Sequence, residues 1–256
     1  MWHRLSSLCL PLRRLPAGEI RSTAAPVPIP AFPVYICTMQ WLLAFTLIAA
    51  TGLHSAEIRI DDMSLLTLDN VRAETTTYHG KVGLKMIEKE SGPGGGLALL
   101  KGLEFRDGEI DLEVAGAPSK TADPTARGFI GVMFRIQADG SHAESFYLRP
   151  TNGRADNQLN RNHSVQYVSY PAWTWQRLRT ETPGQYESYA DMQAGEWIQM
   201  RVVVHGREAE LYVGGAAQPC LVVKDLKLGE SHGGVALWIG PGTEGFFRNV
   251  RVAQAF

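Results

Sequence analysis

Residues 128–150, GFIGVMFRIQADGSHAESFYLRP, carry the clearest structural pattern in the chain, and that pattern is typical of a β-hairpin. Residues 129–136 are rich in strand-forming residues, Asp139-Gly140 is a turn signal, and residues 145–149 resume the alternation. Because strand side chains alternate between two faces, one face of the first strand consists of Ile130, Val132, Phe134 and Ile136. The opposite face consists of Gly131, Met133 and Arg135. In the second strand Phe146 and Leu148 alternate with Tyr147 and Arg149. The hairpin therefore predicts one core face and one polar face.

Short β-rich runs separated by turn signals continue on both sides of this hairpin. Before it they cover residues 73–78, 81–88, 97–105 and 109–114, and after it residues 164–170, 196–205, 209–213, 221–223, 234–239 and 246–252. There is neither a convincing helical period of 3.6 nor a βαβ rhythm. We therefore expect an all-β domain, an antiparallel β-sandwich of the jelly-roll kind.

The interval of residues 150–196 is too long for an ordinary connection, and loops of this size are usually functional or disordered. Its aromatic content argues against disorder. The aromatic residues are Tyr167, Tyr170, Trp173, Trp175, Tyr186 and Tyr189.

Residues 1–56 are predicted to be a leader, and residues 57–256 the folded domain. Residues 34–53 carry no charge, and the stretch from Met39 to Ala56 has the apolar run and small-residue end of a signal peptide. Cleavage after Ser55 or Ala56 predicts a secreted or periplasmic protein. A retained N-terminal membrane anchor is the alternative, since the uncharged run is long enough to span a bilayer. Met39 is a second candidate for the true start.

Composition narrows the class of partner. The chain has a formal net charge of -1, so it lacks the basic excess of a nucleic-acid-binding surface. Membrane contact is expected only through an uncleaved leader. Without the leader the domain keeps a single cysteine, Cys220, which excludes an internal disulfide and is expected to be a buried small apolar residue.

Several motifs together resemble the concanavalin A-like lectin/glucanase sandwiches of secreted bacterial proteins. They are DGEIDLEV, GFIGVMFRI, FYLRP, VQY, GEWIQMRVVVHG, AELYVGG, GGVALWIG and GFFRNVRV. The pattern is most similar to the branch that shares its fold with 3-keto-disaccharide hydrolase domains and laminin-G-like modules. The resemblance covers about residues 57–256 and implies a sheet that faces a glycan. It leaves the activity open, because lectins, hydrolases and adhesion modules share this fold.

Glu109, Asp111 and Glu113 form the one candidate catalytic motif. Alternation places the three carboxylates on one strand face, and paired carboxylates are what retaining glycosidases require. The motif is similar to the E-x-D-x-E signature of laminarinase-type enzymes of the same superfamily. In those enzymes, however, it lies mid-domain, whereas here it follows a turn early in the domain. A solvated strand face opposite Ile110, Leu112 and Val114 explains it as well.

A second group of residues is a candidate ligand-binding site. It consists of Arg135, Tyr147, Arg149, Gln166 and Tyr167, which neighbouring strands would bring to one sheet face. Arginine and glutamine supply planar donors for sugar hydroxyls or a uronate, and tyrosine supplies a ring for stacking. Trp173 and Trp175 would form a sugar platform beside them if the loop is extended. A purely structural arginine–tyrosine network is the alternative. Trp197 and Trp238 are expected in the core.

No cofactor is expected. His142, His163, His205 and His232 lack the spacing of zinc ligands, and a structural calcium remains possible from the superfamily resemblance alone. The sequence thus favours a secreted carbohydrate-binding domain without catalysis, with a polysaccharide or glycoconjugate as partner. A glycoside hydrolase that uses Glu109, Asp111 and Glu113 and a structural adhesion module are the alternatives.

Overall fold

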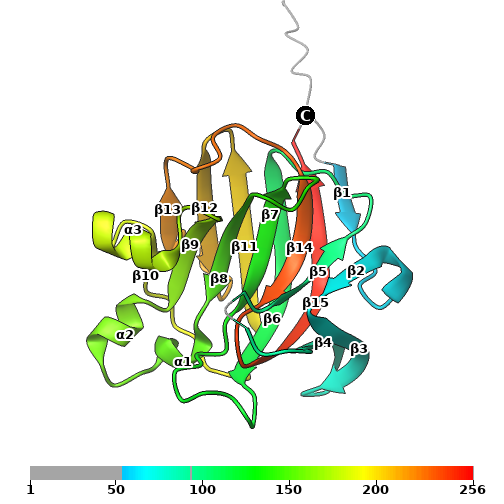
Figure 1. The fold of residues 1–256 in the computed structure, drawn as a ribbon, viewed down its shortest axis with the longest axis horizontal. Coiled ribbons are helices and arrows are strands. Elements are labelled where there is room, and N and C mark those ends of the chain that lie inside the picture. Colours follow the sequence, from blue (N-terminus) through cyan, green and yellow to red (C-terminus); the bar gives the residue numbers. More distant parts are fainter. Residues whose placement is uncertain (1–53, 93, 256) are drawn as a thin grey trace, which may run out of the picture. The chain divides into compact units, whose positions relative to one another are not determined.

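The computed structural model describes residues 54–92 and 94–255, and these form a sandwich of two antiparallel β-sheets (Figure 1). The first sheet has eight strands in the described part of the chain, in the order β13-β12-β11-β6-β15-β4-β3, with β1 paired to β15. The second has seven, in the order β10-β9-β8-β7-β14-β5-β2. The expected all-β sandwich is confirmed.

The strands of the eight-stranded sheet are contributed by both halves of the chain. They are β1 (His54–Glu57), β3 (Val71–Tyr78), β4 (Lys81–Glu88), β6 (Gly108–Pro118), β11 (Ile198–His205), β12 (Glu208–Val213), β13 (Leu221–Val223) and β15 (Thr243–Gln254). The seven-stranded sheet contains β2 (Leu66–Asp69), β5 (Gly96–Leu100), β7 (Ile130–Ile136), β8 (Ala143–Leu148), β9 (Val165–Tyr170), β10 (Glu187–Ser188) and β14 (Gly234–Ile239).

The strand β1 includes the last three residues of the predicted leader, since it begins at His54 and pairs with β15 from His54↔Gln254 to Glu57↔Arg251. The rest of the predicted leader and the alternative start Met39 lie outside the described residues. Cleavage after Ser55 or Ala56 stays a prediction. Within the described ranges, no helix is both long and apolar enough to cross a bilayer.

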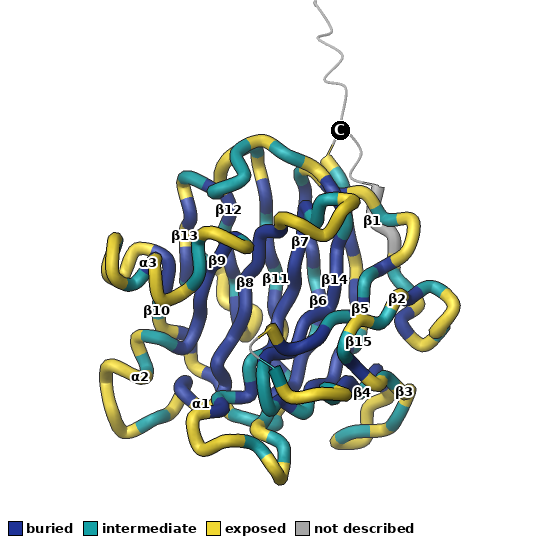
Figure 2. The backbone as a smooth tube through the Cα atoms, in the orientation of Figure 1, coloured by how far each residue is buried: buried dark blue, intermediate teal, exposed yellow. Residues whose placement is uncertain are grey.

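The predicted hairpin is present as β7 and β8, with Gly131 opposite Tyr147 and Phe134 opposite Glu144. Both of its faces are buried, however, so the expected wet polar face is wrong as stated (Figure 2). One face packs against the eight-stranded sheet, where Ile130 of β7 meets the backbone of Gly116 and Gly245. The other face is covered because later segments of the chain lie against it.

The covering segments come mainly from residues 150–196, which contain more regular structure than a loop. This stretch forms the helices α1 (Pro150–Gly153), α2 (Gln158–Asn162) and α3 (Trp175–Glu181). Its strands β9 and β10 extend the seven-stranded sheet beside β8. Asn157 caps α2, and the hydroxyl of Thr174 caps α3 by accepting from the backbone of Arg177. A short 3-10 turn, η1 (Met63–Leu65), precedes β2 on the other side of the sandwich.

Candidate functional site

A cavity of about 900 Å³ opens on the outer face of the seven-stranded sheet. Behind it runs a row of residues in register across the sheet, from Gln166 of β9 through Tyr147 of β8 and Gly131 of β7 to Trp238 of β14. Tyr147 and Trp238 of this row line the cavity. Ile239, the neighbour of Trp238, points the other way and reaches Gly245 of the eight-stranded sheet. The row therefore faces away from the core between the sheets.

Aromatic rings form much of the cavity wall. They belong to Phe129, Tyr147, Tyr170, Trp175 and Trp238. The ring centroids of Tyr147 and Trp238 are 5.2 Å apart, and those of Phe129 and Tyr147 are 6.2 Å apart. Gly131 lies between Tyr147 and Trp238 in the row, and a Cβ atom there would come within 2.2 Å of the carbonyl oxygen of Phe146. The bare backbone at Gly131 is what lets the two rings meet.

Arg149 supplies a buried positive charge to this wall. It directly follows β8, and only 5% of its surface is exposed. Its guanidinium donates to the carbonyl oxygen of His163 (2.9 Å), the hydroxyl of Tyr147 (3.0 Å) and Oε1 of Gln166 (3.1 Å). Burial lowers the pKa of Arg149, but a guanidinium stays protonated in proteins. No carboxylate is among these partners.

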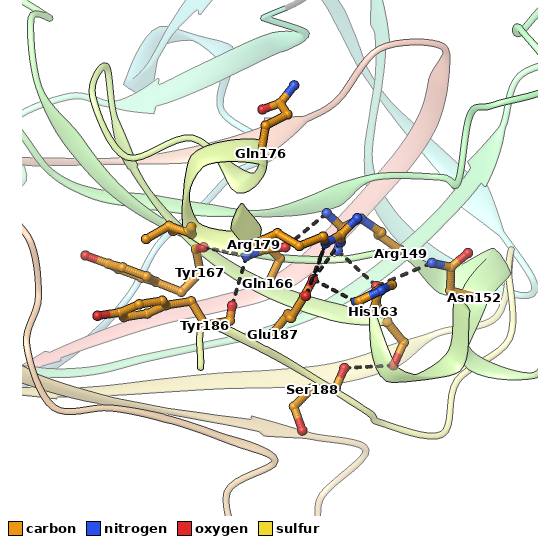
Figure 3. Close-up of polar contacts among 12 residues, drawn as sticks. Arg149, Asn152, His163, Gln166, Tyr167, Gln176, Arg179, Tyr186, Glu187 and Ser188 are labelled. Atoms are coloured by element: carbon orange, nitrogen blue, oxygen red, sulfur yellow. Dashed lines mark hydrogen bonds and ion pairs between the residues drawn. The ribbon is translucent and has the colours of Figure 1, made fainter. Parts of the chain in front are cut away.

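A second cluster of ionisable groups lies beside Arg149 (Figure 3). The guanidinium of Arg179, on α3, holds the carboxylate of Glu187, on β10, through its Nη2 (2.6 Å) and Nε (3.1 Å). Nδ1 of His163 lies 2.8 Å from Oε2 of Glu187, although the contact is not aligned as a hydrogen bond. Burial lowers the pKa of His163, and this outweighs the opposing attraction of Glu187. We therefore treat His163 as neutral at pH 7.

The structure brings four of the predicted ligand-binding residues together. Tyr147, Arg149 and Trp175 line the cavity, and the Arg149 guanidinium lies 5.0 Å from the centroid of the Tyr147 ring and 6.0 Å from that of Trp175. Gln166 supports them from behind, since it accepts from Arg149 and donates to the carbonyl oxygens of Tyr167 and Tyr186. Tyr147, Arg149 and Gln166 could be grouped from the sequence because they share one phase of adjacent strands, whereas Trp175 begins α3.

Arg135 does not belong to this group, contrary to the prediction. It has a φ of 52° at the end of β7, where a bulge opposite Gly234 and Ala236 interrupts the alternation. Its fully buried guanidinium donates to the carbonyl oxygens of Arg106, Gly206 and Gly229 and to Oδ1 of Asp107 at 3.1 Å. Arg135 therefore ties loops together at the other end of the sandwich.

Tyr167 and Trp173 also lie away from the cavity. Tyr167 pairs with Phe146 in register, so its ring is on the core face, where its hydroxyl donates to Glu144 (2.5 Å). In Figure 3 its ring extends beside that of Tyr186, away from the guanidinium of Arg149. The guanidinium of Arg177 stacks on the ring of Trp173, with its Cζ 3.7 Å from the ring centroid. The expected Trp173–Trp175 platform is therefore wrong, because the two residues straddle the start of α3.

The carboxylates of Glu109, Asp111 and Glu113 are on the opposite side of the molecule. They alternate with the buried Ile110, Leu112 and Val114 on β6, in the eight-stranded sheet, and so project from that sheet's outer face. Glu113 pairs with Lys81 (3.1 Å) and Asn249 (2.6 Å), and Glu109 lies 3.8 Å from Arg201. They border two smaller hollows but not the 900 Å³ cavity. This placement supports the solvated strand face and not a shared catalytic cleft.

Three residues of the site were not singled out by sequence reasoning. Arg179 and Glu187 are distant in sequence from the hairpin and carry no motif, and His163 was noted only as one of several scattered histidines. Trp238 is buried as expected, but on the cavity side and not in the core between the sheets. The only sequence signal for this placement is alternation along the strand, which puts Trp238 on the face opposite to that of its neighbour Ile239. In the described part of the chain no cluster of three potential metal ligands occurs.

Comparison with known proteins supports this architecture. A carbohydrate-binding module, CBM66 from Bacillus subtilis, superposes with a TM-score of 0.50 at 14% identity, over 73% of this chain and 95% of the module. A candidate glycosyl hydrolase from Parabacteroides distasonis superposes with a TM-score of 0.52 at 11% identity, over 78% of this chain and 98% of the other. At such identities the likeness shows the fold alone. No curated protein matches in sequence.

Family membership follows from the sequence itself. The family described as the 3-keto-alpha-glucoside-1,2-lyase-like domain matches residues 66–253. These run from the start of β2 to the penultimate residue of β15 and contain every residue of the cavity named above. The chain belongs to this family, within the concanavalin A-like lectin/glucanase superfamily.

Proposed function

We propose that this protein binds a carbohydrate in the 900 Å³ cavity on the outer face of the seven-stranded sheet, and that it does so outside the cell or in the periplasm. The observation that carries the proposal is the wall of five aromatic rings around a buried arginine. A sugar ring has apolar C–H faces and a rim of hydroxyl groups. It is matched by ring faces that exclude water together with a few fixed polar groups.

The fixed polar groups are held before any ligand arrives. Tyr147, Gln166 and His163 hold the Arg149 guanidinium from three sides, and the side-chain amide of Asn152 donates to the same carbonyl oxygen of His163 (3.3 Å). Such preorganisation lowers the entropy lost on binding. The location rests on the predicted leader and on the secreted bacterial proteins that the sequence resembles.

Glycan-array screening of the full chain, followed by calorimetry with the strongest ligand, tests the proposal. Trp175 and Trp238 both line the cavity, so binding should change the intrinsic fluorescence of the protein. Trp175→Phe should diminish that change. Arrays without any saccharide ligand, or a ligand whose binding and fluorescence response are the same in Trp175→Phe and wild type, would contradict it.

Catalysis in the same cavity is a second candidate, and the cluster of His163, Glu187 and Arg179 favours it. Elimination from a 3-keto-α-glucoside needs a base for the C2 proton, which the neighbouring ketone makes acidic. The electron pair of that C–H bond forms the C1=C2 double bond, and the C1–O bond breaks with its electrons on the departing oxygen, which then takes a proton. His163 fits the role of the base because it is neutral and its Nε2 has no protein partner among the described residues.

Arg149 fits the second requirement of that reaction. Removal of the C2 proton places negative charge on the C3 oxygen, and buried guanidinium N–H groups are suited to stabilise it. A nitrophenyl 3-keto-α-glucoside assay tests this reading, with nitrophenol release expected for wild type and a loss of about 100-fold or more for His163→Gln. If wild type releases no nitrophenol from a 3-keto-glucoside that it binds, the cavity is a binding site only.

A further inference from the structure

The floor of the cavity carries an unbalanced positive charge. Arg149 and Arg179 line this part of the wall, and Glu187 lies behind Arg179 without lining the cavity. The lowered pKa of His163 keeps that ring neutral at pH 7. The charge of Glu187 is paired with that of Arg179, which donates to both carboxylate oxygens. Two guanidinium groups against one carboxylate leave one cation in excess, and that cation is the 95% buried Arg149.

The rim of the cavity does not supply the missing anion. Its cations are Arg72, Lys120 and Arg127, and its acids are Glu88, Asp123 and Glu244, so the rim is balanced. Each acid also has a partner of its own, although Oε1 of Glu88 has none among the described residues. Glu244 pairs with Lys85 (2.7 Å), Glu88 accepts from the backbone of Gly242 (2.6 Å), and Asp123 accepts from the backbone and hydroxyl of Thr125.

The protein contacts of Arg149 do not require its charge. Its three acceptors are a carbonyl oxygen, a phenol and an amide oxygen, and neutral donors would satisfy all three. These bonds use three of the five guanidinium N–H groups, so two have no acceptor among the described residues. A buried charge without a counter-charge is unfavourable, whereas one that meets an anion in its ligand forms strong charge-assisted hydrogen bonds.

We propose that the cavity selects an anionic saccharide, in which a carboxylate or sulfate ester meets the free N–H groups of Arg149. This inference rests on the proposed carbohydrate binding and adds the chemical class of the ligand. It differs from an oxyanion role of Arg149 in catalysis, because a transient oxyanion predicts no preference for charged ligands in the ground state.

The experiment compares charged saccharides with neutral forms of the same shape. The probes are tri-galacturonate and its fully methyl-esterified form, and a sulfated galactan tetrasaccharide and its desulfated form. Each is titrated calorimetrically into the full chain at two salt concentrations. We expect at least one charged form to bind about tenfold or more tighter than its neutral partner, since a hydrogen bond to a charged group is roughly twice as strong as a neutral one. A preference for tri-galacturonate identifies the anion as a carboxylate, and a preference for the sulfated galactan identifies it as a sulfate ester.

Variants test whether the preference for charged saccharides comes from Arg149. Arg149→Gln should reduce the ratio of charged to neutral affinity to about twofold or less, while Arg149→Lys should keep part of it. Arg72→Gln is the matched control, because it removes the same charge from an exposed rim position and should leave most of the ratio in place. If Arg149→Gln does not fold, the comparison of charged and neutral ligands in wild type still decides the question.

The outcomes separate the two proposals. Equal binding of charged and neutral forms overturns the anionic ligand but leaves carbohydrate binding standing. A preference lost equally in Arg72→Gln and Arg149→Gln assigns selectivity to the general field of the rim and overturns the role of Arg149. Absence of binding by every saccharide on the array and in the probe set overturns both.

Discussion

Truncation of Trp175 to alanine should weaken saccharide binding with little loss of stability. The ring is at the cavity mouth with 38% of its surface exposed, so it already contributes less to folding than a buried ring does. A tryptophan side chain has about 250 Å² to bury, so about 95 Å² remain for a ligand to cover. At about 25 cal/mol per Å², full coverage is worth about 2.4 kcal/mol.

A sugar covers one face of the ring, so about half of that value is the expected loss. About 1.2 kcal/mol corresponds to roughly an eightfold increase in Kd. The assay is calorimetry with the strongest array ligand, alongside thermal melts. Tyr189→Ala is the control, because Tyr189 is also 38% exposed but does not line this cavity. The reasoning is refuted if Trp175→Ala binds as tightly as wild type, or if Tyr189→Ala is weakened as much.

Four further outcomes are expected. Burial raises the pKa of Glu144, so the protonated form stabilises the folded protein at low pH, and this stability is lost as the pH rises through the folded-state pKa. The melting temperature of Glu144→Gln relative to that of wild type should therefore increase from pH 4 to pH 7. A difference in melting temperature that does not vary with pH would contradict this. Arg135→Met should lower the free energy of unfolding, measured with denaturant, by about 3–5 kcal/mol, because it leaves Asp107 and three loop carbonyl oxygens without their donor. The saccharide affinity of the folded variant should be unchanged. Glu109→Gln and Glu113→Gln should leave saccharide binding intact and change stability by about 0.5 kcal/mol or less, and loss of binding in either would return the carboxylates to the site. Burial raises the pKa of Cys220 to about 11, so the native thiol should react with a thiol reagent at pH 8 much more slowly than the unfolded chain, and equal rates would show that the strand region around it is open.

The site was only partly predictable, and the reason differs from residue to residue. Tyr147, Arg149 and Gln166 were found together because strand pairing conserves phase between neighbours. Arg135 shares that phase on paper, but a bulge with a φ of 52° turns it to another part of the protein. Tyr167 was misplaced because it directly follows Gln166, and alternation along a strand puts neighbouring residues on opposite faces. Tyr167 lies on the core face, where its hydroxyl donates to Glu144.

The sequence by itself determined the all-β antiparallel sandwich, the central hairpin, and the burial of Ile110, Leu112 and Val114, because alternation and turn signals are local properties of the chain. The tertiary structure alone decided that Arg179 and Glu187 stand beside His163, and that Glu109 and Arg149 face opposite sides of the molecule. These arrangements depend on which strands become neighbours and on how residues 150–196 fold across the sheet. Such long-range packing leaves no periodic trace in the sequence.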